Sequence, residues 1–199
     1  LSASSIRYPI VRIWPSVSIR TPFPSRVVPK TSAVRASLGM VDFTFTIYEY
    51  NSIDELSKDE QILINRSKEI VKNAYAPYSK FNVGAAVLLE NGEIIAGTNQ
   101  ENAAYPSGLC AERVAIFYAN SKYPDVPVKA IAVSAFTNGE FIENPVPPCG
   151  SCRQVISETE NRFKTPIQIY LVSKEKVYMI KDANMLLPLH FDAYFLKKN

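Results

Sequence analysis

Pro148-Cys149-Gly150-Ser151-Cys152, together with the earlier segment Cys110-Ala111-Glu112-Arg113, indicates both the fold and the chemistry of this chain. The two segments contain all three cysteines of the 199-residue sequence. Three thiolates can hold one zinc ion and leave its fourth tetrahedral position open, which is typical of a catalytic rather than a structural site. We therefore predict a zinc centre with one ion per subunit, held by Cys110, Cys149 and Cys152.

Both cysteine segments are expected to lie at the start of a helix. Residues 150–158 follow Pro148 as a helical pattern, which puts Cys149 and Cys152 three residues apart on one face. Cys110 likewise precedes an apolar helical pattern in residues 114–118. Unpaired backbone N–H groups and the positive end of the helix dipole favour a thiolate at such a position. Two helix N-termini are thus predicted to face one cation.

Three charged side chains adjoin the predicted ligands. Glu112 is two residues from Cys110, where it can take a proton from zinc-bound water and pass it to a substrate nitrogen. Arg113 directly follows Glu112, and Arg153 directly follows Cys152. We expect both guanidinium groups to donate charge-assisted hydrogen bonds to the sulfurs, which would offset the negative charge of a zinc ion with three thiolates.

Other interpretations of the cysteines stay open at this point. Cys149 and Cys152 form a C-x-x-C pair, which is often a redox motif, but that interpretation leaves Cys110 unexplained. A structural zinc would require a fourth ligand. His190 is the only histidine, and we expect it to have a local packing or hydrogen-bonding role.

Several separate motifs, in the same order, closely resemble the signature of the cytidine deaminases of pyrimidine salvage. The likeness runs from about residue 74 to about residue 192. Within the family, the chain resembles the small, homotetrameric type, whose zinc is held by cysteines alone. The motifs occupy residues 76–86, 99–106, 110–113, 148–154 and 186–188.

The resemblance implies roles for further residues. In the family, the residues matching Asn99 and Glu101 hydrogen-bond the ribose, and the residue matching Phe81 lies against the pyrimidine ring. Residues matching Tyr105 and Phe191 approach the site from a neighbouring subunit, which implies a homotetramer with shared active sites. Each of these residues also has a structural alternative: Phe81 and Phe191 as ordinary core residues, Asn99 as a turn residue at a strand end, and Tyr105 as a plain interface residue. The implied substrate-binding residues are Phe81, Asn99, Glu101, Tyr105, Ala111 and Phe191.

The implied activity is hydrolytic deamination of free cytidine or 2′-deoxycytidine, giving uridine or 2′-deoxyuridine and ammonia. Zinc-bound hydroxide would attack C4 of the base while Glu112 delivers a proton to N3. The alternatives are a deaminase of a related small nucleoside such as an antibiotic, a deaminase of bases in nucleic acid, and a non-enzymatic zinc-stabilised binding module. Residues 40–199 carry 16 basic against 19 acidic side chains, so we expect no nucleic-acid partner.

Residues 1–39 differ in composition from the rest of the chain. They hold six basic residues, five prolines and no acidic residue. We predict a disordered extension, either an organelle-targeting segment or sequence upstream of a start at Met40, followed by a single zinc-dependent deaminase domain over residues 40–199. No stretch is long and apolar enough to span a membrane. Because the cysteines serve a metal, the expected location is the cytoplasm, with organelle targeting as the alternative.

Local patterns predict the order of the elements after Met40. Ser57-Lys58-Asp59-Glu60 is a capping box that opens a helix through about Ala74, and Asn91-Gly92 joins two strands as a hairpin. The predicted fold class is α/β, a three-layer α/β/α arrangement around a mixed five-stranded sheet. Residues 41–50 alternate like a strand but have no predicted partner. The five strands are expected at 83–89, 94–97, 130–136, 167–172 and 177–180, with a short helix at 182–187.

Overall fold

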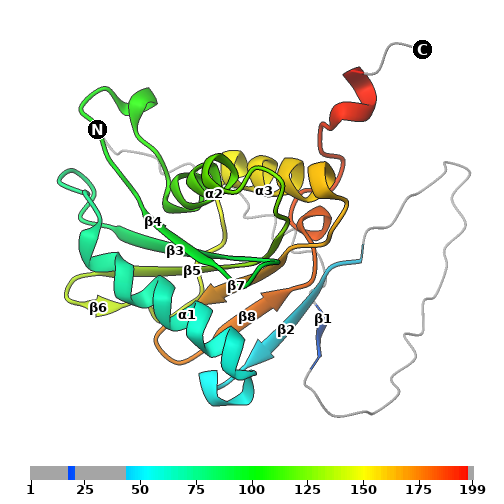
Figure 1. Cartoon of the computed structure of the whole chain (residues 1–199). Helices are drawn as coiled ribbons and strands as arrows, with labels where there is room; N and C mark the ends of the chain where they lie inside the picture. Colours follow the sequence, from blue (N-terminus) through cyan, green and yellow to red (C-terminus); the bar gives the residue numbers. More distant parts are fainter. Residues whose placement is uncertain (1–17, 21–43, 197–199) are drawn as a thin grey trace, which may run out of the picture.

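The computed structural model describes residues 18–20 and 44–196, and its centre is one mixed sheet (Figure 1). The strands lie in the order β1-β2-β8-β7-β5-β3-β4, with β6 paired to β5. All five predicted strands are present, and the hairpin between β3 and β4 turns at Gly92 with a φ of 85°. The five are β3 (Asn82–Leu89), β4 (Ile94–Thr98), β5 (Val128–Thr137), β7 (Gln168–Val172) and β8 (Val177–Ile180).

The sheet has eight strands, three more than the sequence predicted. The strand-like segment after Met40 supplies β2 (Thr46–Tyr50), which pairs antiparallel with β8 so that Tyr50 faces Val177. A three-residue strand, β1 (Ser18–Arg20), lies parallel to β2, and β6 (Glu140–Phe141) folds back on β5. The α/β fold class is unchanged, because these strands only extend the predicted sheet.

Helices cover both faces of the sheet, as the three-layer prediction requires. In Figure 1, α1 (Lys58–Ile70) lies below the sheet, while α2 (Ala111–Lys122) and α3 (Gly150–Phe163) lie above it. The predicted capping box is present at α1: Ser57 Oγ accepts from Glu60 N, and the Glu60 carboxylate accepts from Ser57 N at 2.7 Å. The described residues also form short 3-10 turns: η1 (Ile53–Glu55), η2 (Val71–Asn73), η3 (Tyr105–Ser107), η4 (Ala183–Met185) and η5 (Ala193–Leu196).

Alternating side chains of the central strands form two cores, one on each face. On β5, Ile131 and Val133 pack under α2 and α3, whereas Ala130 and Ala132 pack against α1. This alternation is the period of two expected for a strand that is buried on both faces. Gly84 of β3 permits the close approach of α1, because a Cβ there would lie 2.3 Å from the carbonyl oxygen of Ser67.

The topology brings the starts of α2 and α3 to one edge of the sheet. β4 and β5 are both antiparallel to β3, so they are parallel to each other and end at the same edge. Thr98 and Ser134 both pair with Gly84 and therefore mark the same level of the sheet. α2 follows β4 and α3 follows β5 and β6, so both helices begin near that edge.

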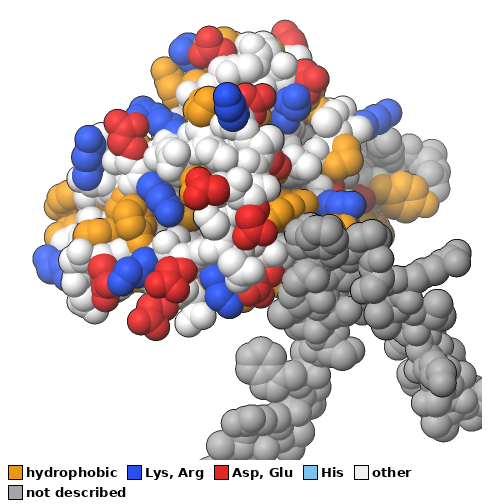
Figure 2. Space-filling model, turned by 90° about the horizontal axis from the view of Figure 1, so that it is seen from below, with side chains coloured by type: hydrophobic (Ala, Val, Ile, Leu, Met, Phe, Trp, Pro, Cys, Tyr) orange, Lys and Arg blue, Asp and Glu red, His pale blue; other side chains and the backbone are white. Residues whose placement is uncertain are grey.

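Charges on the underside of the molecule are mixed in sign. Figure 2, which views the fold from below, shows acidic and basic side chains interspersed over the described surface. Apart from Ser18–Arg20, residues 1–39 lie outside the described residues, so the expectations for that segment stay predictions. No helix within residues 44–196 combines the length and the apolar character needed to cross a bilayer.

Candidate metal centre and adjoining cavity

The N-terminal ends of α2 and α3 bring the three cysteines together. Cys110 directly precedes α2 and Cys149 directly precedes α3, and both have extended backbone conformations. Cys152 lies in the first turn of α3 and is fully buried. The predicted meeting of two helix N-termini is therefore found in the structure. It gathers positive dipole ends around the sulfurs, where thiolates are stabilised.

The distances between the sulfurs fit one zinc ion. Cys149 Sγ lies 3.8 Å from Cys110 Sγ and 3.4 Å from Cys152 Sγ, and all three atoms lie within 4.8 Å of one another. Tetrahedral zinc with Zn–S bonds of about 2.3 Å holds its sulfurs roughly 3.8 Å apart. All three cysteines are free rather than disulfide-bonded. The donor set is therefore suited to zinc in spacing and in chemistry.

Among the described residues, the cluster of metal-ligating side chains holds these three sulfurs and no fourth ligand atom. His190 instead has its Nδ1 3.3 Å from the carbonyl oxygen of Leu187 and its Nε2 3.9 Å from the Asp192 carboxylate, which agrees with the predicted local role. Three protein ligands leave a fourth zinc position for water or substrate, as in catalytic sites.

The pKa values of the Cys110 and Cys152 thiols are shifted in opposite directions. Hydrogen bonding from the Cys152 thiol, aided by Arg113 and Cys149, lowers the pKa of Cys110 to about 5 despite burial. The pKa of Cys152 is raised, because its proton is shared with the Cys110 sulfur and because it is buried. Cys110 is therefore the preferred thiolate in the metal-free cluster, and a bound cation would displace the proton of Cys152.

Glu112 lies beside the sulfur cluster in the first turn of α2. Its side chain is only 5% exposed, and burial, which outweighs favourable hydrogen bonds, raises the pKa of its carboxyl. The nearby Cys110 sulfur acts in the same direction, whereas Arg113 opposes it. A buried carboxyl group within the first turn after Cys110 is in place to exchange protons with a group held at that centre.

Of the two predicted arginine–sulfur contacts, the structure contains that of Arg113 but not that of Arg153. Arg113 Nη2 lies 3.7 Å from Cys110 Sγ and donates to it, as expected. Arg153 does not: its Nε donates to the carbonyl oxygen of Pro148 at 2.8 Å and its Nη1 to that of Leu186 at 2.9 Å. The prediction of an Arg153 bond to a sulfur is wrong, because its Nε and Nη1 groups bond two main-chain carbonyls instead. Arg153 thus fixes the backbone before Cys149.

A cavity of about 550 Å³ opens beside Cys110. Three of the residues implied by the resemblance line it, namely Asn99, Glu101 and Tyr105. Such a volume lies within the range of small-molecule sites. The full lining comprises Tyr78, Ser79, Asn99, Gln100, Glu101, Asn102, Tyr105, Gly108, Leu109, Cys110 and Arg113.

Asn99 and Glu101 also hold the backbone of residues 78–83, of which Tyr78 and Ser79 line the same cavity. Asn99 Oδ1 accepts from the backbone N–H of Val83 at 2.8 Å, and its Nδ2 donates to the carbonyl oxygen of Phe81 at 2.9 Å. Glu101 Oε2 accepts from the backbone N–H groups of Tyr78 at 2.9 Å and Ser79 at 3.3 Å. Both residues line the cavity, and their side chains fix the backbone of residues 78–83.

The remaining predicted site residues are less tightly grouped. Tyr105 is 77% exposed, and its ring meets that of Tyr78 edge-on at 6.1 Å between centroids. Ala111 is fully buried at the start of α2, and Phe81 is half-buried. Phe191 is 58% exposed, and its backbone oxygen accepts from Gln154. Within this one subunit, Phe81, Ala111 and Phe191 are not part of the cavity lining.

Sequence reasoning missed the roles of Tyr78 and Ser79. Both lie in the motif of residues 76–86, which was the available signal, but they contribute backbone N–H groups to Glu101. Residue types do not reveal such main-chain donors, so only the folded loop identifies them.

The family model and the curated relatives that match this chain are all described as deaminases. A family model described as "Cytidine and deoxycytidylate deaminase zinc-binding region" matches residues 57–165. A cytidine deaminase from Halalkalibacterium halodurans is 49% identical over 100 residues, which cover 50% of this chain and 71% of that protein. One from Sporosarcina psychrophila is 52% identical over 100 residues, covering 50% and 69%.

Solved structures share the fold as well. The crystal structure of a cytidine deaminase from Burkholderia pseudomallei is 37% identical and superposes with a TM-score of 0.58, covering 68% of this chain and all of that one. A cytidine deaminase from Mycobacterium tuberculosis is 28% identical with a TM-score of 0.53, covering 68% of this chain and 98% of its own.

Proposed function

The chain belongs to the cytidine and deoxycytidylate deaminase family, and from this premise we propose that it hydrolyses free cytidine and 2′-deoxycytidine to the uridine nucleosides and ammonia, as in pyrimidine salvage. The single observation that carries the proposal is the convergence of three sulfurs within 4.8 Å beside a buried glutamate and an open cavity. A module that only binds zinc for stability would need neither the glutamate nor the cavity.

We assign Cys110, Cys149 and Cys152 as the ligands of one zinc ion per subunit. When bound, zinc supplies a water molecule of lowered pKa as the nucleophile for the base. Two arginine side chains support the ligands. Arg113 donates to Cys110 and so spreads the excess negative charge of three thiolates. Arg153 holds the carbonyl of Pro148 and thereby fixes the turn that presents Cys149.

Glu112 is assigned as the proton carrier. Its carboxyl group is buried near the start of α2, two positions beyond Cys110, which supports a role in moving protons between water and the leaving amine. Burial excludes bulk water as a competing acid or base. Glu112 would accept a proton from the attacking water, deliver one to N3 of the base and assist the departure of ammonia.

A free nucleoside suits the cavity better than a nucleotide or a polynucleotide. Glu101 places a carboxylate in the lining, which can accept from a sugar hydroxyl and would repel a phosphate there. Arg113 is the one basic residue in the lining, and it is already bonded to Cys110. The mixed charges visible in Figure 2 give the described underside no basic stripe for a phosphate backbone. Asn99 and Glu101 are assigned to the ribose, and Phe81 and Ala111 to the base.

We propose a homotetramer with shared active sites. Tyr105 and Phe191 are the two residues assigned to a neighbouring subunit's site, and both project from the subunit with large exposed rings. Phe191 stacks on Phe195 at 5.9 Å between centroids, next to the exposed side chains of Tyr194 and Leu196. An aromatic surface of this kind is typical of a protein interface.

Location and domain boundaries follow from the same assignment. Thiols devoted to a metal function in a reducing compartment, so we propose the cytoplasm. We propose residues 40–199 as one deaminase domain that follows an extension over residues 1–39.

The decisive experiment incubates the zinc-loaded protein with cytidine, 2′-deoxycytidine, deoxycytidine monophosphate and single-stranded DNA. We expect release of ammonia and formation of the uridine nucleoside from the first two substrates. A clear preference for the monophosphate would contradict the nucleoside assignment, and zinc-loaded protein without turnover on any substrate would contradict catalysis. Sedimentation analysis of the same sample tests the tetramer.

A further inference from the structure

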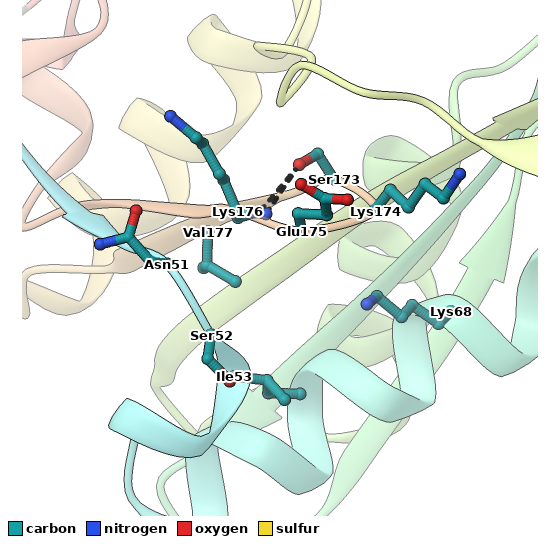
Figure 3. Close-up of a pocket in the computed structure, with 9 residues that line it drawn as sticks. All are labelled: Asn51, Ser52, Ile53, Lys68, Ser173, Lys174, Glu175, Lys176 and Val177. Atoms are coloured by element: carbon teal, nitrogen blue, oxygen red, sulfur yellow. Dashed lines mark hydrogen bonds between the residues drawn. The ribbon is translucent and has the colours of Figure 1, made fainter.

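A second cavity, of about 320 Å³, lies between the end of β2, the helix α1 and the turn that joins β7 to β8 (Figure 3). None of its lining residues belongs to the cavity beside the cysteines. It is lined by Asn51, Ser52, Ile53, Lys68, Ser173, Lys174, Glu175, Lys176 and Val177, and we call it the Lys68 cavity.

Lys68 is the unusual group of this cavity. Its side chain leaves α1 and runs into the space under the turn at residues 173–176 (Figure 3). The residue is half-buried, and this burial lowers the pKa of its ammonium group. Its Nζ lies 5.5 Å from the centroid of the Phe141 ring. No carboxylate in the described part of the chain comes within ion-pair distance of it.

The other charges of the cavity also favour an anion. Lys174 Nζ lies 3.0 Å from the Glu140 carboxylate and Lys176 Nζ lies 2.7 Å from that of Glu49. Both side chains of the Lys174–Glu140 pair are exposed, and such a surface pair is weak enough for an incoming anion to compete with it. The Lys176–Glu49 pair is more protected, because the Glu49 side chain is only 15% exposed. The lining residues include three lysines and one acidic residue, Glu175, and of the three ammonium groups that of Lys68 points into the space, whereas those of Lys174 and Lys176 point away from it (Figure 3).

We propose that the Lys68 cavity binds a small phosphorylated molecule, with the phosphate on the Lys68 ammonium group. A half-buried cation without an anionic neighbour is costly, and a phosphate would relieve that cost. The volume is near the lower limit of small-molecule sites, so it has room for more than the phosphate alone. The half-buried Ile53 offers apolar surface to the remainder of the ligand, and the Asn51 amide offers a hydrogen bond.

The test measures binding by calorimetry on the zinc-loaded full chain. The probes are inorganic phosphate, ribose 5-phosphate and uncharged ribose, none of which carries a pyrimidine for the deaminase site. We expect ribose 5-phosphate to bind more tightly than phosphate, and ribose not to bind. Phosphate binding as tight as that of ribose 5-phosphate would identify a free-anion site and overturn the small-molecule assignment.

Matched variants locate the site. Lys68→Met keeps the aliphatic stem and removes the charge, so ribose 5-phosphate should bind about tenfold more weakly. Lys72→Met makes the same charge change at an exposed position one helical turn away, outside the lining, and should alter affinity by less than about twofold. Glu175→Gln removes the one carboxylate of the lining and should strengthen binding. Equal losses in the Lys68 and Lys72 variants, or no loss in the Lys68 variant, would overturn the proposal.

A measurement on the unaltered chain covers the case in which Lys68→Met does not fold. Ribose 5-phosphate should protect Lys68, but not Lys72, from acylation by an amine reagent, as read by mass spectrometry of peptides. Unprotected Lys68 at saturating ligand would contradict the assignment. Because the Lys68 cavity is separate from the deaminase site, bound ribose 5-phosphate should leave deaminase activity unchanged. The binding and activity measurements therefore distinguish a failure of this inference from a failure of the proposed function.

Discussion

Ser67 and Ser134 share a hydrogen bond of 2.6 Å between their Oγ atoms, across 67 positions of the chain. Both residues are fully buried, one on α1 and the other on β5. Ser67 Oγ also donates to the carbonyl oxygen of Ile64 at 2.7 Å, so Ser134 acts as donor to Ser67. This pair ties α1 to the middle of the sheet.

The first prediction concerns this serine pair. Ser67→Ala leaves the Ser134 hydroxyl buried without its partner and should lower the free energy of unfolding by about 1–3 kcal/mol. Ser134→Ala should cost less, because Ser67 keeps its bond to Ile64. Urea unfolding of both variants and of the double variant gives the coupling, which we expect to be about 1 kcal/mol. Strictly additive losses would contradict the shared bond.

The second prediction concerns the close packing of α1 on β3. Gly84→Ala would place a methyl group 2.3 Å from the carbonyl oxygen of Ser67, so the helix must shift. We expect a loss of about 1–3 kcal/mol in the free energy of unfolding. Gly150→Ala is the control, because a Cβ there meets no atom within 4 Å, and it should be neutral or slightly stabilising. Equal effects of the two changes would argue against the steric explanation.

The third prediction is a pH dependence set by Glu60. Burial would raise the pKa of this carboxyl, but hydrogen bonds from Tyr170 and Ser57 outweigh it and lower the pKa. Glu60 therefore stabilises the fold above its unfolded-state pKa of about 4.3, and this contribution is lost as the pH falls through the folded-state value. Glu60→Gln should reduce stability at pH 7, and the difference from the wild type should shrink toward about pH 3.

Glu69→Gln provides the control for Glu60 on the same helix. A hydrogen bond from the exposed Arg66 lowers the pKa of Glu69, so its contribution should vanish in high salt. The Glu60 contribution should survive high salt, because the Tyr170 side chain that donates to it is buried. Thermal unfolding between about pH 3 and 8 at two salt concentrations separates the cases. A Glu60 effect that salt abolishes would refute the buried origin.

The fourth prediction concerns Cys149. Cys149→Ser should abolish stoichiometric zinc binding and lower the unfolding temperature, because metal binding by residues on two helices is also folding energy. Ser151→Ala, in the same turn but without a ligand atom in the cluster, should retain full zinc content. Elemental analysis with and without a chelator measures both. A Cys149→Ser protein with one zinc per subunit would remove Cys149 from the ligand set.

The fifth prediction concerns Glu112. Glu112→Gln keeps the shape of the side chain and removes its proton chemistry, so turnover of cytidine should fall by about 10²–10⁴-fold or more. Zinc content should stay that of the wild type, since Glu112 is outside the sulfur cluster. Steady-state ammonia release and elemental analysis on one sample give both numbers. Near-normal turnover would exclude Glu112 as the proton carrier.

The sequence by itself determined the elements that depend on neighbouring residues. Ser57 and Glu60 reach each other across one helical turn, and the Asn91-Gly92 turn needs only the positive φ of Gly92. The predicted order of strands and helices was therefore confirmed. The pairing of Cys149 and Cys152 on one helix face was equally local, and Cys110 was predicted as the third ligand because it is the one other cysteine and adjoins Glu112.

Tertiary structure alone decided the features built from distant segments. The pairing of Tyr50 with Val177 joins parts of the chain that no local pattern connects, so the partner of β2 stayed unknown until the fold was complete. Arg153 turned away from the sulfurs because carbonyls of Pro148 and Leu186 lie within its reach. The Lys68 cavity likewise exists only where three separate segments meet. Local preferences act over a few residues, whereas side-chain partners and cavities depend on which surfaces the packed core brings into contact.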